Sequence, residues 1–75
     1  STTPRRRSIK MIECLIETKS LEDREIAMEI LHYYGSVSKT WEDYSFNFKF
    51  HHEEGVCEGL MELEAYLPQV LCSRV

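Results

Sequence analysis

The sequence predicts a single α+β domain in which two helices cover one face of a four-stranded antiparallel sheet. Three observations lead to this fold class. Residues 44–50 alternate aromatic and polar side chains, which is the pattern of a half-buried strand. Residues 21–34 and 56–67 each repeat apolar side chains at helical spacing. A length of 75 residues allows one domain, near the lower limit for folding without disulfides or metal.

Residues 9–18 form the first element, and their pattern fits either a helix or a strand. A helix would place Lys10, Glu13 and Glu17 on one face. The isoleucines and the threonine favour a strand, and a second helix follows two residues later without Gly or Pro at the joint. We expect a strand, with a helix as the alternative. The strand would place Ile12, Cys14 and Ile16 on one side and Met11, Glu13 and Leu15 on the other.

The next element is a helix from Leu21 to Tyr34. Ser20 is a suitable N-cap, and acidic residues fill the first turn, where the helix dipole favours negative charge. Gly35 is expected to end the helix in a left-handed cap. The apolar face would consist of Ile26, Ala27, Ile30, Leu31 and Tyr34.

Two strands are expected next, Val37 to Trp41 and residues 44–50, with a turn at Glu42 and Asp43. The aromatic side of the second strand should face the helices, because its other side is too polar to form a core. The aromatic residues are Tyr44, Phe46, Phe48 and Phe50, and the alternating polar ones are Ser45, Asn47, Lys49 and His51.

A last helix begins at Glu53 and is ended by Pro68, and residues 69–75 form a short terminal strand. The helix would bury Val56, Cys57, Leu60, Leu63 and Leu67. The element order is then β-α-β-β-α-β, and two right-handed crossovers close it as a ferredoxin-like sandwich. We divide the chain into a flexible basic tail, residues 1–8, and one domain, residues 9–75.

Charge is distributed unevenly along the chain. Four basic residues lie within the first ten positions, whereas the remaining 65 residues carry thirteen acidic and five basic side chains. An acidic domain repels polyanions, so nucleic acid is an unlikely partner. Stacking of RNA would also require the aromatic residues to lie on the uncovered sheet face.

The cysteines and the hydropathy indicate the cellular setting. Cys14, Cys57 and Cys72 are odd in number, widely spaced and set in apolar segments, so we expect buried, reduced thiols. No apolar run approaches the roughly 20 residues that a membrane-spanning helix needs. We therefore expect an intracellular protein, cytoplasmic or nuclear, without a membrane partner.

The sequence offers no catalytic constellation. A nucleophile needs an adjacent base and a group that orients this base, and none of the three histidines has a Ser or Cys nucleophile motif nearby. Adjacent strand residues point to opposite faces, so His51 and Glu53 are at most two ligands of a metal site. We expect no enzyme activity, no metal and no cofactor.

The domain resembles the ACT family in its pattern. The resemblance rests on residues 27–31 continuing to Gly35-Ser36-Val37, on residues 45–50 and on residues 56–67. It implies a regulatory domain that dimerises and is attached to a larger enzyme or transcription factor. The ligand loop that the resemblance implies is Thr18, Lys19, Ser20 and Leu21, which lacks the Asp and Gly that amino-acid-binding members carry.

Three groups of residues are candidates for contact or modification. Met11 and Leu15 would lie on the uncovered sheet face and serve a homodimer, which would also add stability to so small a core. Glu58 and Glu62 of the acidic last helix are candidate contacts for the alternative function, a module that docks a partner protein through this acidic helix or through the sheet face. Ser8 follows three arginines and is a candidate phosphorylation site.

Overall fold

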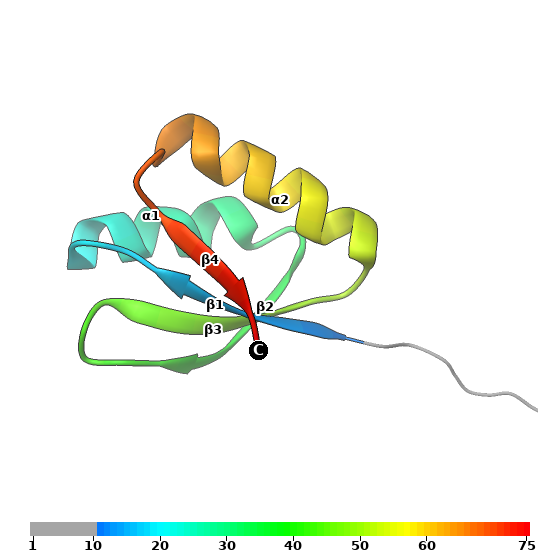
Figure 1. The fold of residues 1–75 in the computed structure, drawn as a ribbon, viewed down its shortest axis with the longest axis horizontal. Coiled ribbons are helices and arrows are strands. Elements are labelled where there is room, and N and C mark those ends of the chain that lie inside the picture. Colours follow the sequence, from blue (N-terminus) through cyan, green and yellow to red (C-terminus); the bar gives the residue numbers. More distant parts are fainter. Residues whose placement is uncertain (1–10) are drawn as a thin grey trace, which may run out of the picture.

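The computed structural model describes residues 11–75, which form a four-stranded antiparallel sheet with two helices packed on one side (Figure 1). The strand order is β2-β3-β1-β4. This arrangement confirms the ferredoxin-like α+β fold. The tail at residues 1–8, with Ser8, and the first two positions of the domain lie outside the described residues. The elements are β1 (Ile12–Glu17), α1 (Leu21–Leu31), β2 (Gly35–Thr40), β3 (Ser45–Phe50), α2 (Glu53–Tyr66) and β4 (Leu71–Arg74).

Strand β1 resolves the ambiguity of the first segment in favour of a strand. It pairs with β3 on one side and with β4 on the other, so it lies in the interior of the sheet. Cys14 and Ile16 are fully buried under the helices, whereas Glu13 and Leu15 face the uncovered side. The β-branched residues therefore determine the structure here, since they fit a pleated surface that is packed on both edges.

Helix α1 begins as expected and ends earlier than expected. The Ser20 side chain accepts a hydrogen bond from the backbone N–H of Asp23 at 3.1 Å, which confirms the N-cap. The helix ends at Leu31 and not at Tyr34, and residues 32–34 form a turn. The expectation that Ile26 belongs to the buried face was wrong, because this side chain is exposed.

Gly35 has a different role from the one that the sequence suggested. It does not adopt a positive φ, so it is not a left-handed helix cap. It is the first residue of β2 and lies opposite Phe50 of β3. A Cβ atom at this position would lie 1.9 Å from the carbonyl oxygen of Lys49. Glycine is required because the two strand backbones approach each other too closely for any side chain.

The core is centred on the phenylalanines of β3. Phe46, Phe48 and Phe50 are almost completely buried, and neighbouring rings meet edge to face at centroid distances of 6.4 and 4.8 Å. The core is completed by Cys14, Ile16, Ala27, Leu31, Val56 and Leu63. Tyr44 was wrongly assigned to this stripe: its φ of 69° places it in the turn, and its ring is exposed.

We predict that Gly35→Ala destabilises the domain by at least about 2 kcal/mol, because the new methyl group meets a backbone oxygen that cannot move aside. Chemical denaturation followed by circular dichroism measures the effect.

Gly55→Ala is the matched control. The added Cβ would meet its nearest neighbour, Tyr34, at an ordinary 3.7 Å, and alanine favours the helix, so we expect a change between zero and about 1 kcal/mol of stabilisation. Equal effects of the two substitutions would contradict the close approach at Gly35.

Candidate functional site

The side of the sheet that carries no helix, here called the open face, is the strongest candidate site. It holds a shallow groove of about 550 Å³ whose apolar lining comes from Leu15, Trp41 and Val75. Glu42, Asp43, Ser45 and Asn47 complete its lining. Trp41 and Val75 are 42% and 77% exposed, so large apolar surfaces face solvent at this site. Apolar groups that gather on one uncovered face indicate a contact surface.

Trp41 is held in place from several directions. Its indole Nε1 donates to Oδ1 of Asn47 at 2.9 Å, and its backbone N–H donates to the carbonyl of Ser45 at 2.9 Å. Its carbonyl accepts a hydrogen bond from Nη1 of Arg24 at 2.9 Å, and Nζ of Lys39 lies 3.9 Å from the ring centroid. An exposed aromatic ring that is fixed in this way loses little conformational entropy on binding.

Glu13 lies next to this ring system in a polar network across three strands. One carboxylate oxygen, Oε2, accepts hydrogen bonds from Nδ2 of Asn47 at 2.9 Å and from the Ser38 hydroxyl at 3.0 Å. The Asn47 amide, followed by the Ser38 hydroxyl, lowers the pKa of the Glu13 carboxyl. Ser38 reaches the carboxylate because β2 contains an irregularity between Val37 and Lys39.

The two predicted contact residues of β1 belong to this surface. Met11 is exposed just before β1, and Leu15 lies on the open face between Asn47 of β3 and Ser73 of β4. The sequence analysis missed Trp41, which it treated only as a strand end. A tryptophan beside a turn, with an asparagine six residues later on the polar side of the following strand, was the available signal.

The predicted ligand loop is used largely for structure. The Thr18 hydroxyl donates to the carbonyl of Tyr44 at 2.5 Å and thereby joins this loop to the β2–β3 turn. Ser20 caps α1, and Leu21 is exposed. Of the four predicted residues, Lys19 lines a pocket.

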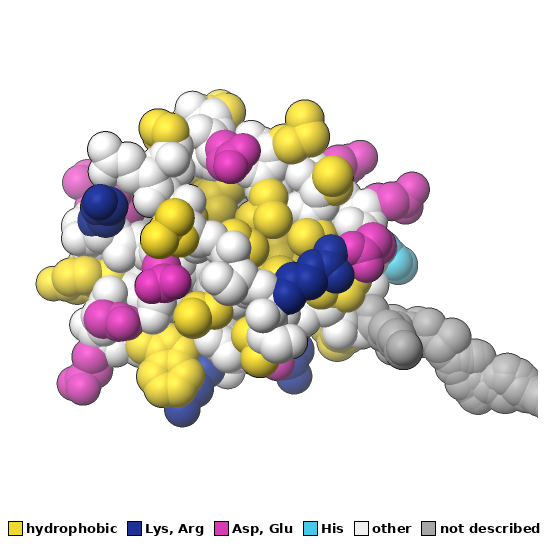
Figure 2. Space-filling view, viewed as in Figure 1, with side chains coloured by type: hydrophobic (Ala, Val, Ile, Leu, Met, Phe, Trp, Pro, Cys, Tyr) yellow, Lys and Arg dark blue, Asp and Glu magenta, His cyan; other side chains and the backbone are white. Residues whose placement is uncertain are grey.

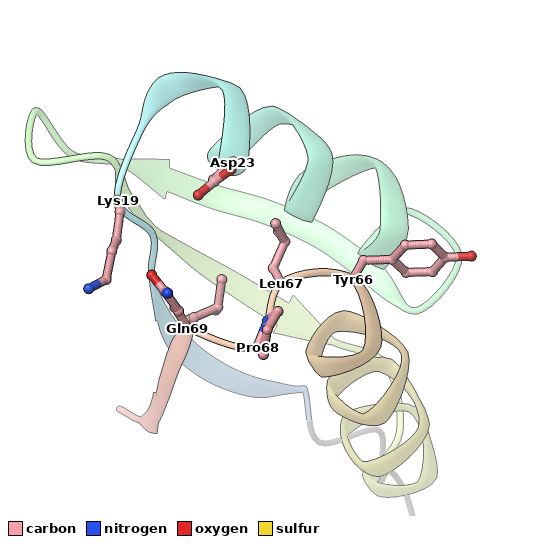
Figure 3. A pocket seen from close by; sticks show the side chains of 7 residues that line it. Lys19, Asp23, Tyr66, Leu67, Pro68 and Gln69 are labelled. Carbon is pink, nitrogen blue, oxygen red and sulfur yellow. The ribbon is translucent and has the colours of Figure 1, made fainter.

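That pocket is small, about 120 Å³, and lies between the start of α1 and the end of α2 (Figure 3). Lys19 and Asp23 supply opposite charges, and the rest of the lining is Tyr66, Leu67, Pro68, Gln69 and Val70. In Figure 3 the Tyr66 ring points away from the other labelled side chains. The pocket therefore offers one cation and one anion beside an apolar wall.

The acidic residues Glu58 and Glu62 lie on α2, which covers the other side of the sheet from Leu15. Glu62 accepts a hydrogen bond from the Tyr34 hydroxyl at 2.7 Å, which raises the pKa of this phenol. Glu58 is exposed and lines a shallow hollow with His51 and His52. The structure thus separates the two predicted contact groups, and docking of a basic partner at α2 stays a prediction.

The expectation of three buried thiols was wrong for two of them. Cys14 is buried in the core, whereas Cys57 and Cys72 are exposed. Cys57 lies on α2 beside the hollow that Cys14 and Cys72 also line, and Cys72 lies on β4 at the edge of the sheet. The thiol of Cys72 points to the helix side, where burial is the main cause that raises its pKa to about 12.

Two further properties concern residues 11–75 alone. Neither helix in this range is long and apolar enough to span a membrane. In the same range, no three His, Cys, Asp or Glu side chains are grouped so that they could hold a metal ion.

Comparisons of the chain with family models, with curated proteins and with solved structures find no match in any of the three sets. The resemblance to the ACT family therefore stays a prediction from the sequence pattern.

We predict that NMR titration finds the pKa of Glu13 below its ordinary value of 4.5 and that Asn47→Ala raises it more than Ser38→Ala does. Because the folded pKa is depressed, the stabilisation from this network is present above the unfolded pKa and is lost as pH falls through the folded pKa. A Glu13 pKa that is unchanged in Asn47→Ala would contradict the network. The indole N–H resonance of Trp41 should shift in the same variant, since it loses its acceptor.

Proposed function

We propose that this domain is a non-catalytic regulatory module that forms a homodimer through its open face. The observation that carries the proposal is the apolar surface of Leu15, Trp41 and Val75 on the helix-free side of the sheet. The Trp41 indole is oriented by its hydrogen bond to Asn47 and by Lys39 over its ring, so the exposed aromatic surface has one preferred position before any partner binds. A fixed aromatic ring is the kind of residue that dominates interface energetics.

Charge on the open face suits a second copy. Lys49 lies near one end of β3, whereas Glu42 lies in the turn at its other end. Two copies that stack face to face with antiparallel strands would bring Lys49 of one near Glu42 of the other, twice by symmetry. Glu13 lies near the centre, where Oε2 already accepts hydrogen bonds from Asn47 and Ser38 and Lys49 lies opposite in β3, which lowers the cost of covering this carboxylate.

Dimerisation also fits the size of the domain. A single core of this size contributes only about 3–5 kcal/mol of net stability, so a second hydrophobic contact has a large relative effect. Sheets that pack face to face lie about 10 Å apart, which leaves room for one layer of interleaved side chains such as Leu15 and Trp41.

The regulatory part of the proposal concerns the pocket at Lys19 and Asp23. Its opposite charges suit a small zwitterion, whose carboxylate would meet Lys19 and whose ammonium would meet Asp23. The pocket is formed by the β1–α1 and α2–β4 loops, and these lead into β1 and β4. Both strands contribute to the open face, so occupancy of the pocket would be linked to dimerisation.

We predict that the chain sediments as a concentration-dependent dimer and that Trp41→Ala weakens dimerisation by about 2 kcal/mol, or roughly 30-fold. Leu15→Asp should give a monomer, because it places a charge in the apolar contact.

Met61→Asp is the control for these variants, since Met61 is 68% exposed on α2 and lies away from the open face. It should leave the dimer intact. A chain that is still a strict monomer at about 1 mM would overturn the proposal, because its dimer dissociation constant would then lie above this concentration.

We predict that at least one free amino acid raises the melting temperature of the chain and that Lys19→Glu abolishes this shift. Differential scanning fluorimetry with a panel of amino acids measures it, and Glu25→Lys on the exposed surface of α1 is the control for altered charge. If no amino acid in the panel changes the melting temperature, the ligand-sensing part of the proposal is wrong. The dimer is tested separately by sedimentation.

A further inference from the structure

A second apolar surface lies between helix α2 and edge strand β4, on the other side of the sheet from the open face. It consists of two adjoining hollows of about 370 and 330 Å³, and Leu60 and Cys72 line both. Figures 1 and 2 show the molecule in the same view. In Figure 2, hydrophobic side chains fill the space between α2 and β4 as Figure 1 labels them. The further lining consists of Cys14, Glu53, Val56, Cys57 and Arg74 in one hollow and of Leu63, Glu64, Val70 and Leu71 in the other.

Strand β4 borders this groove and has a free edge among residues 11–75. It is the last strand of the sheet and pairs only with β1. The backbone N–H of Val75 donates to the carbonyl of Glu13 at 3.0 Å. Since hydrogen-bonding residues alternate along an antiparallel strand, Leu71 and Ser73 also direct their backbone groups to β1. The N–H and C=O groups of Cys72 and Arg74 therefore point outward.

The outward backbone groups and the groove belong to the same residues. Cys72 and Arg74 lie opposite Ile16 and Cys14, so their side chains are on the helix side of the sheet. Residues of an added strand that lie opposite Cys72 and Arg74 would direct their side chains to the same side. Two positions of such a strand, separated by one residue, would enter the two hollows.

We propose that the α2–β4 groove binds an extended segment of another protein, which adds to β4 as a fifth strand and places two apolar side chains, two residues apart, in the groove. Main-chain hydrogen bonds with Cys72 and Arg74 hold the segment in register. The two hollows select its apolar side chains.

Charge around the groove identifies the flanks of the segment as basic. Helix α2, which forms one wall, carries Glu53, Glu54, Glu58, Glu62 and Glu64 and no basic residue. Arg74 of β4 already neutralises Glu53 at one end, whereas Glu64 lines the other hollow. Lysine or arginine beside the apolar pair would meet Glu64, and acidic flanks would be repelled.

The same charges disfavour a second copy as the occupant. Residues 11–75 carry thirteen acidic and five basic side chains, so two copies joined at this groove would bring two acidic helices together. The groove is also separate from the open face. The inference therefore stands independently of the proposed dimer.

Three fluorescein-labelled synthetic peptides test the inference with the 75-residue chain. KKVSVSKK has the apolar spacing and the basic flanks, EEVSVSEE reverses the charge, and KKVVSSKK keeps the composition but breaks the spacing. Fluorescence anisotropy should show saturable binding of KKVSVSKK, at least about tenfold tighter than either other peptide at low salt. Equal affinities, or no saturation below about 1 mM, would overturn the inference.

Paired variants locate the binding. Cys72→Pro removes an outward N–H that makes no bond to β1, and proline is tolerated at such edge positions. It should abolish binding, whereas Cys72→Ala, which keeps the N–H, should not. Glu64→Lys should weaken binding of KKVSVSKK about three- to tenfold, and Glu25→Lys on α1 should have no effect.

Amide chemical shifts provide the last readout and do not depend on any substitution. KKVSVSKK should shift resonances of residues 57–64 and 71–74 while those of Lys39 and Trp41, which lie far from β4 across the sheet, stay unchanged. Shifts confined to the open face would overturn the inference. Groove shifts that appear with rising protein concentration and no peptide would identify a second copy as the occupant, and would overturn it also.

Discussion

Strand β3 carries three phenylalanines on one side and short or polar residues on the other, and the rest of the domain is arranged around this asymmetry. Phe46, Phe48 and Phe50 are covered by both helices, which complete the core around them. Their rings set the register of β1, which places Cys14 and Ile16 beside them. Gly35 lies opposite Phe50, where a Cβ would meet the backbone carbonyl of Lys49 and also the Phe48 ring.

Coverage of one side leaves the other side uncovered, and the two proposed contact surfaces follow from this geometry. The helix-free side keeps Leu15 and Trp41 in solvent, and both are positioned by neighbours that belong to the folded sheet. On the helix side, β4 is short and lies at the edge, so α2 does not close completely over it. A domain this small has too few residues to cover both places, and partners that cover them would add stability.

Much of the fold could be predicted from the sequence, because periodicity is a local property. The aromatic alternation of β3 and the capped start of α1 were correct for this reason. The role of Gly35 was predicted wrongly, because the carbonyl that leaves no room for a side chain there belongs to Lys49, fourteen positions later in the chain. The exposure of Cys72 depends on β4 being an edge strand. The role of Trp41 depends on its bond to Asn47, and strand register alone determines that contact.

Intermolecular NOEs show whether the open faces of two copies meet. A sample that mixes isotope-labelled and unlabelled chains gives signals only between atoms of different copies. We expect NOEs from the Trp41 indole protons of one copy to methyl groups of Leu15 or Val75 of the other. Intermolecular NOEs that connect α2 or β4 side chains instead, with none at Trp41, would contradict a dimer through the open face.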